Sequence, residues 1–204
     1  MLWIALAAQL SAPEPKQSWF DRTDFWAQEL AQQSLAGVWL RITVTPDAKT
    51  QACEIERSSG NPGFDARVCE ITMKRAQFRP GSLQDGTPAY GVFRIPVIFT
   101  AIPPSWYTRK PQVLMPVGDL NLTVDRLPKG KTSPLRVQLA FAVETDGRLS
   151  ACGAQDSKQD PTLVSLACRE MSTQFKAVPA KRPDGTAVLS VQNGRVLFSE
   201  RPLR

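Results

Sequence analysis

Two cysteine-bounded stretches decide how this chain is organised: CEIERSSGNPGFDARVC at residues 53–69 and CGAQDSKQDPTLVSLAC at residues 152–168. The two cysteines have the same spacing in both stretches. Sliding the chain so that Cys53 falls on Cys152 also aligns identical residues on either side. They are Leu40 with Leu139, Val44 with Val143, Asp47 with Asp146, and Asp85-Gly86-Thr87 with Asp184-Gly185-Thr186. Agreement at one fixed offset indicates an internal duplication.

Outward from the first stretch, the sequence alternates in the manner of a small sheet. Residues 38–45, VWLRITVT, place apolar and polar side chains in turn, which is typical of a half-buried strand. A turn at residues 46–49 leads to a second strand at residues 53–57. The pair Asn61-Pro62 then predicts a helix start, because Asn caps well and Pro suits the first helical position.

A third apolar strand is expected at Phe93–Phe99. It contains Pro96, which cannot donate a ladder hydrogen bond, so the strand should lie at a sheet edge or carry a bulge there. The second half repeats the order, with a strand over Leu135–Val143 and a helix beginning at Asp160-Pro161. Near its end, Asn193-Gly194 predicts a tight turn or a bulge.

The sequence thus predicts an α+β fold made of two tandem β-β-α-β units, each a small antiparallel sheet covered by one helix. In the lead before the first unit, the apolar residues Phe20, Phe25, Trp26 and Leu30 suggest a short helix that covers the first sheet. The expected parts are a signal-peptide-like segment at 1–12, the lead at 13–35, the first unit at 36–100, a Pro-rich linker at 101–118 and the second unit at 119–204.

The four cysteines favour two local disulfides. Cys53 falls on a strand and Cys69 inside the helix that crosses it, and Cys152 and Cys168 repeat this placement. Each bond would close a loop worth about 3 kcal/mol and would need an oxidising compartment. Four buried free thiols are the alternative, which the paired spacing disfavours. Zinc binding and thioredoxin-like chemistry would want CxxC motifs, which are absent.

Composition argues against most enzymes and against nucleic acid as a partner. The chain has no histidine, which removes the usual general base and the Ser-His and Cys-His nucleophiles. Its net charge of +6 comes from scattered basic residues rather than a patch. The cluster Ser58, Ser59 and Asp65 precedes and opens a helix, where a turn and cap is the simpler interpretation. We therefore expect no catalytic site, metal, cofactor or tightly bound small molecule.

The N-terminus carries an apolar run, LWIALAAQL, at residues 2–10. A membrane span needs about 20 such residues, so this run is too short to cross. It matches the apolar region of a secretory signal peptide, although no basic residue precedes it. A short helix packed on the domain is the alternative. Together with the cysteines, the run predicts export to the periplasm.

Several short motifs stand in order along the first unit, between Ala36 and Phe99. They are Ile42-Thr43-Val44-Thr45-Pro46-Asp47, Cys53, Ser58-Ser59-Gly60, Phe64-Asp65, Cys69, Phe78-Arg79-Pro80 and Asp85-Gly86. In this order they resemble the C-terminal domain of the TonB energy-transducer family. The second unit is a degenerate relative, with Ser157-Lys158-Gln159 in place of Ser58-Ser59-Gly60.

The resemblance implies a periplasmic domain that binds an envelope protein or peptide, such as an outer-membrane transporter, along a sheet edge. In this mode, called β-augmentation, an extended segment satisfies the unpaired backbone groups of an edge strand. We expect the contacts on the third strand of the first unit, at Tyr90, Val92, Arg94, Ile95 and Val97. The long spacer of full transducers is missing, which favours binding without energy coupling. A transducer subunit anchored in the inner membrane by an uncleaved N-terminus is the alternative.

Overall fold

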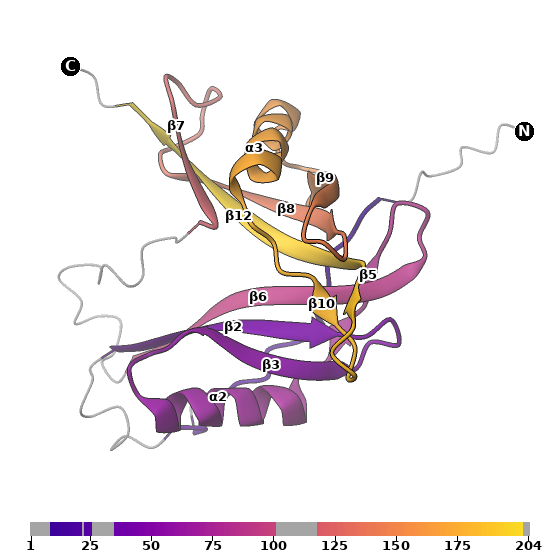
Figure 1. The fold of residues 1–204 in the computed structure, drawn as a ribbon. Coiled ribbons are helices and arrows are strands. Elements are labelled where there is room, and N and C mark those ends of the chain that lie inside the picture. The colour runs from indigo at the N-terminus through magenta and orange to yellow at the C-terminus, as the bar shows by residue number, and fades with distance from the viewer. Residues whose placement is uncertain (1–8, 22, 26–34, 101–117, 202–204) are drawn as a thin grey trace, which may run out of the picture.

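The computed structural model describes residues 9–21, 23–25, 35–100 and 118–201, and its fold is α+β, as predicted (Figure 1). Within these residues, two helices, α2 (Pro62–Arg75) and α3 (Pro161–Gln174), accompany the strands. The strands are β1 (Glu14–Pro15), β2 (Leu35–Val44), β3 (Thr50–Arg57), β4 (Phe78–Arg79), β5 (Gly81–Ser82), β6 (Pro88–Thr100), β7 (Leu120–Val124), β8 (Leu135–Val143), β9 (Leu149–Ala154), β10 (Ala180–Lys181), β11 (Ala187–Val188) and β12 (Ser190–Glu200). Eight of them form one sheet in the order β3-β2-β6-β12-β8-β9, with β5 added beside β6 and β7 beside β12.

In the first half, α2 packs across β2, β3 and β6. The helix starts where the Asn61 side chain accepts a hydrogen bond from the Phe64 N–H at 3.1 Å. Phe64, Val68 and Ile71 are then buried on one helical face. Each such side chain contributes roughly 1.5–3 kcal/mol when fully buried. Opposite them lie the inward residues of β2, which are Val38, Leu40, Ile42 and Val44.

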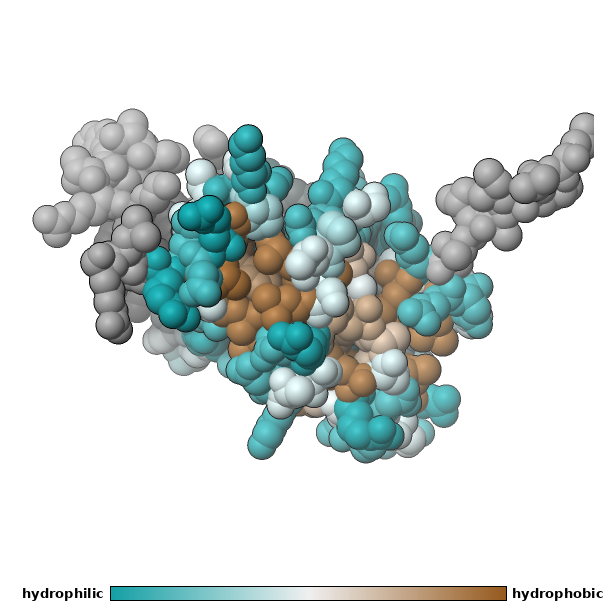
Figure 2. All heavy atoms as spheres, turned by 90° about the horizontal axis from the view of Figure 1, so that it is seen from above, coloured by the Kyte–Doolittle hydropathy of each residue, from teal (hydrophilic) through white to brown (hydrophobic). Residues whose placement is uncertain are grey.

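In the second half, α3 packs across β8, β9 and β12 in a similar way. Asp160 caps it by accepting hydrogen bonds from the N–H groups of Thr162 and Leu163. Leu163 and Met171 are buried against Leu139 of β8. Seen from the α3 side, the surface shows apolar patches between hydrophilic side chains (Figure 2). Half-buried apolar residues around this second core include Leu120, Leu122, Val124, Val164 and Leu166.

Both predicted disulfides are present. Cys53–Cys69 joins β3 to α2 with a Cα–Cα distance of 5.5 Å, and Cys152–Cys168 joins β9 to α3 at 5.7 Å. Disulfides persist in oxidising compartments, so they are consistent with a place outside the cytoplasm. Neither of the two described helices has the length and hydrophobicity needed to span a bilayer.

The two halves meet at their last long strands. β6 and β12 run parallel and pair over Tyr90–Val92 and Ser190–Gln192. Outward from β6 lie β2 and then β3, and outward from β12 lie β8 and then β9. The helices α2 and α3 lie on opposite sides of the sheet (Figure 1). The halves therefore share one sheet, where the sequence had predicted two. Most of the predicted linker, residues 101–117, lies outside the described part of the chain.

The described part of the N-terminal segment, from residue 9 onward, packs against the rest of the fold. Leu10 and Ala12 are buried in a third apolar cluster with Ala140 and Val191. Ser11 forms a backbone bridge with Ser82 of β5. These residues fall within the predicted signal-peptide-like segment, whose residues 1–8 lie outside the described part.

The lead that follows also contributes to the core. Trp19 and Phe25 are buried in the first core, and Phe20 packs against it. β1 pairs with β4 at the start of this lead. Of the predicted short helix, Trp26 and Leu30 lie outside the described residues.

Substituting Gly91 should loosen this N-terminal segment. A Cβ atom at Gly91 would lie 2.0 Å from Cγ of Pro13, so Gly91→Ala must push the segment away. We expect a loss of about 1–3 kcal/mol in the free energy of unfolding, the usual cost of overpacking. Trypsin cleavage at Lys16 should also become faster.

Gly153→Ala is the matched control, because it adds the same methyl group to β9 where nothing lies within 4 Å. It should leave stability and cleavage close to those of the parent. Equal behaviour of the two variants in urea unfolding and in proteolysis would contradict the packing described for Pro13.

Candidate functional site

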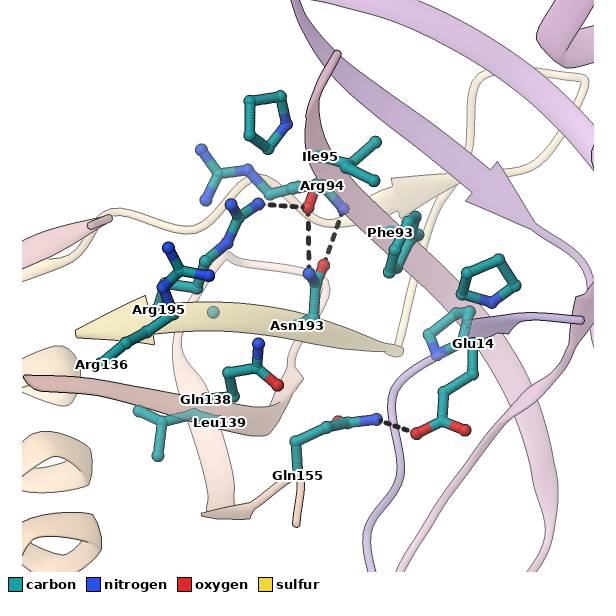
Figure 3. Close-up of a pocket in the computed structure, with 14 residues that line it drawn as sticks. Glu14, Phe93, Arg94, Ile95, Arg136, Gln138, Leu139, Gln155, Asn193 and Arg195 are labelled. Atoms are coloured by element: carbon teal, nitrogen blue, oxygen red, sulfur yellow. Dashed lines mark hydrogen bonds between the residues drawn. The ribbon is translucent and has the colours of Figure 1, made fainter. Parts of the chain in front are cut away.

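β6 and β12 separate shortly after they pair, and the side chain of Asn193 marks the point. Its Oδ1 accepts a hydrogen bond from the Arg94 N–H at 2.7 Å, and its Nδ2 donates to the Arg94 carbonyl at 3.0 Å (Figure 3). The side-chain amide thus replaces the peptide group that a neighbouring strand would supply. Beyond it, β12 pairs with β7 instead of β6, over Val196–Glu200 and Leu120–Val124.

A cavity of about 500 Å³ opens where the strands part, and we call it the groove. It is lined by β6 from Phe93 to Pro96, by β8 and β12 around Gln138 and Gly194, and by the segment Pro13–Pro15. Figure 3 shows these side chains coming from parts of the chain that are far apart in sequence. The groove is therefore formed jointly by both halves and the N-terminal segment.

The outer side of β6 is open beyond Arg94. Backbone groups of alternate residues point to opposite sides of a strand, and those of Arg94 point away from β2, toward Asn193. The nitrogen of Pro96 and the N–H and carbonyl of Ile98 must point the same way. Within the described residues, no strand pairs with β6 on this side beyond Val92, apart from the Asn193 contact. Pro96 therefore interrupts no bond to β2, and the pairing of β2 with β6 shows no bulge there.

Arg94 holds the base of the groove together. Its guanidinium bonds both carboxylate oxygens of Glu56, at 2.8 and 2.9 Å, and also Oδ1 of Asp119. The side chains of Arg94 and Asp119 are only 15% and 4% exposed. Burial lowers the pKa of Arg94, but the hydrogen bonds and charges of Glu56 and Asp119 outweigh burial and raise the pKa above its usual value. Arg94 is thus a neutralised cation that links β3, β6 and the start of β7.

Arg195 lies beside it without such a partner. Its guanidinium stacks on the Trp39 ring at 4.9 Å and donates to the Arg94 carbonyl at 2.7 Å. Burial lowers its pKa, Asp119 opposes this, and the nearby charges of Arg136 and Arg94 lower the pKa further. Among the described residues, neither Arg195 nor Arg136 has a carboxylate within ion-pair distance. These two arginines leave an excess of positive charge at one end of the groove.

The opposite end of the groove carries one carboxylate, that of Glu14. It accepts a hydrogen bond from Nε2 of Gln155 at 2.8 Å and lies 4.0 Å from the guanidinium of Arg79. Figure 3 shows Glu14 and Gln155 on one side of Asn193, with Arg136 and Arg195 on the other. The excess of positive charge in the groove therefore lies at the end that holds Arg136 and Arg195.

The predicted partner-binding residues lie in four different environments on β6. Tyr90 and Val92 pair with β12, so that part of the strand is not an edge. Arg94 belongs to the ion-pair network, Ile95 lines the groove, and Val97 is buried in the first core. Binding at these residues stays a prediction. On the outer side of β6, backbone groups without a strand partner in the described part of the chain begin at Pro96.

Sequence reasoning missed the opposite wall of the groove. This wall carries Arg136, Gln138 and Arg195. No local sequence signal links them to β6. The predicted turn or bulge at Asn193-Gly194 is wrong, since β12 continues through it. Gly194 is needed because a Cβ there would lie 2.5 Å from Cε1 of Phe141.

The serine cluster that precedes α2 shows the hydrogen bonds of a helix start. The Ser59 N–H donates to Asp65 Oδ1 at 3.1 Å, and the Asn61 N–H donates to Ser59 Oγ at 3.2 Å. In the described part of the chain, no group of three or more Cys, Asp or Glu side chains is placed to hold a metal ion. Comparison with models of known protein families, with curated proteins and with solved structures finds no match.

Proposed function

We propose that this protein binds an extended segment of another envelope protein by β-augmentation along β6. The observation that carries the proposal is the outer side of β6 from Pro96 onward, which pairs with no strand among the described residues and borders the groove. An added strand could bond the Pro96 carbonyl and both backbone groups of Ile98. Main-chain bonds of this kind supply affinity, and the groove side chains supply specificity.

Two further features support a TonB-like binding protein. Residues 35–100 contain β2, β3, α2, the two-residue strands β4 and β5, and then β6. Residues 135–200 contain β8, β9, α3, the two-residue strands β10 and β11, and then β12. In each half a disulfide joins the second long strand to the helix. We take the halves to be two copies of one unit like the TonB C-terminal domain. The disulfides fit a periplasmic location. A role linked to TonB-type transport, with an outer-membrane protein as partner, follows from this likeness and has no enzymatic step.

The variant Ile98→Pro tests the edge directly. Because the Ile98 N–H points away from β2, proline removes a donor on the open side and none from the β2 ladder. We expect it to bind peptides about ten-fold more weakly, as for one lost hydrogen bond with added crowding. Peptides would first be selected from a random seven-residue pool on the oxidised full chain, and affinity measured by fluorescence anisotropy.

Ile98→Val is the matched control, since it keeps the N–H and a β-branched side chain. It should bind like the parent, and both variants should keep the parent's circular dichroism spectrum. Hydrogen exchange of the Ile98 amide should slow when peptide is bound. Selection of no peptide, or equal binding by the proline and valine variants, would overturn the proposed site.

A further inference from the structure

The arginines that turn inward between the two halves differ in one respect. Arg41 pairs with Glu54 at 2.8 Å, and Arg94 pairs with Glu56 and Asp119. Arg195 is half-buried beside them, and its backbone N–H donates to Asp119 Oδ2 at 2.7 Å, yet no carboxylate oxygen among the described residues lies within 4 Å of its guanidinium. A cation that is partly removed from water is stabilised by an anionic partner. Among these arginines, an anion would therefore gain most binding free energy at Arg195.

A second arginine lies close to it on the same face of the sheet. In the register of β8 and β12, Arg195 is opposite Gln138, and Arg136 stands two residues before Gln138. Diagonal neighbours of this kind are about 7–8 Å apart. Figure 3 shows both side chains extending to the same end of the groove. The two like charges repel, and a carboxylate near both would relieve that repulsion.

Arg195 is also held ready for such a ligand. Its guanidinium lies over the Trp39 ring, and the Arg94 carbonyl accepts a hydrogen bond from one of its N–H groups. A guanidinium has five N–H donors in a rigid fork, so most of its donors remain for a ligand. Little side-chain freedom would be lost on binding, which favours affinity.

We propose that Arg136 and Arg195 bind a carboxylate side chain of the partner, so that the segment added to β6 is acidic at this end. The inference rests on the proposed function and specifies the chemistry of its partner. At the other end the groove lining contains no arginine, and Glu14 already lies near Arg79, so nothing there favours an acidic residue. The bound segment therefore carries its acidic residue at one place and not throughout.

The test is a selection from random seven-residue peptides whose C-termini are amidated, so that only side chains can supply carboxylates. The parent should enrich Asp or Glu at one position several-fold. Arg136→Glu should lose that preference and enrich Lys or Arg instead. Arg136 is exposed, so the variant should unfold at the same urea concentration as the parent.

Arg169→Glu is the matched control, with the same charge change on an exposed residue of α3. It should select the same peptides as the parent. For one selected peptide, replacing its acidic residue by the amide should weaken binding about ten-fold, and added salt should reduce the difference.

The outcomes separate the two proposals. Enrichment without an acidic preference, or the same preference in Arg136→Glu, would overturn the carboxylate site and leave β-augmentation standing. Selection of no peptide by the parent would overturn the proposed function and the inference with it.

Discussion

Replacing Arg94 by methionine should reduce the free energy of unfolding by about 3–5 kcal/mol, the cost of removing one partner from a buried ion pair. Methionine has a similar length but leaves the carboxylates of Glu56 and Asp119 without their cation. Asp119 is only 4% exposed, so water cannot replace the guanidinium there. Urea unfolding followed by tryptophan fluorescence and by circular dichroism would measure the loss.

Two companion variants make the result specific. Arg148→Met removes an arginine whose pair with Asp146 is exposed, and it should change stability by less than about 1 kcal/mol. Adding Asp119→Asn to Arg94→Met should restore part of the loss, because no uncompensated charge is then buried at that position. The amide oxygen of the asparagine can still accept the hydrogen bond that the Arg195 N–H now donates to Asp119 Oδ2 at 2.7 Å. A loss in Arg94→Met no larger than that in Arg148→Met would contradict the ion-pair network.

Removing one disulfide, by Cys53→Ala with Cys69→Ala, should cost about 3 kcal/mol, because the unfolded chain regains the entropy of a loop near 15 residues long. The Cys152–Cys168 disulfide closes a loop of equal sequence separation. Removing it, by Cys152→Ala with Cys168→Ala, should therefore cost the same free energy of unfolding. Domains of this size are stable by about 5–15 kcal/mol. Removing both disulfides should therefore leave the protein close to its unfolding threshold.

The measurement is the urea midpoint of each double variant and of the combined quadruple variant, under one buffer. Reduction of the parent with dithiothreitol should reproduce the quadruple variant. A loss below about 1 kcal/mol for either pair would mean that its loop is already constrained in the unfolded chain. Clearly unequal losses would show that the loop-entropy account does not hold equally for both halves.

Features that depend on neighbouring residues could be predicted from the sequence. The strands around Leu40 and Leu139 follow from alternation, and the helix starts follow from Asn61 and Asp160. The disulfides follow from placing one cysteine on a strand and the next on the helix that crosses it. Each of these depends on residues within about twenty positions of one another.

The groove could not be predicted in this way. It depends on Asn193 reaching the backbone of Arg94, a contact between distant parts of the chain. An Asn-Gly pair favours a turn by local preference, yet Gly194 here makes room for Phe141. Likewise Arg94 and Arg195 have the sequence character of surface residues. Only tertiary pairing with Asp119 and Trp39 explains their burial.

The junction of β6 with β12 also bears on how the protein acquires its structure. Tyr90 and Ser190 pair directly, so this contact closes a very long stretch of chain, whereas the hairpins β2–β3 and β8–β9 close only short ones. Long closures cost more chain entropy and form more slowly. Each half should accordingly assemble around its own hairpin and helix first. Docking of the halves, which creates the groove, then comes last along the folding pathway.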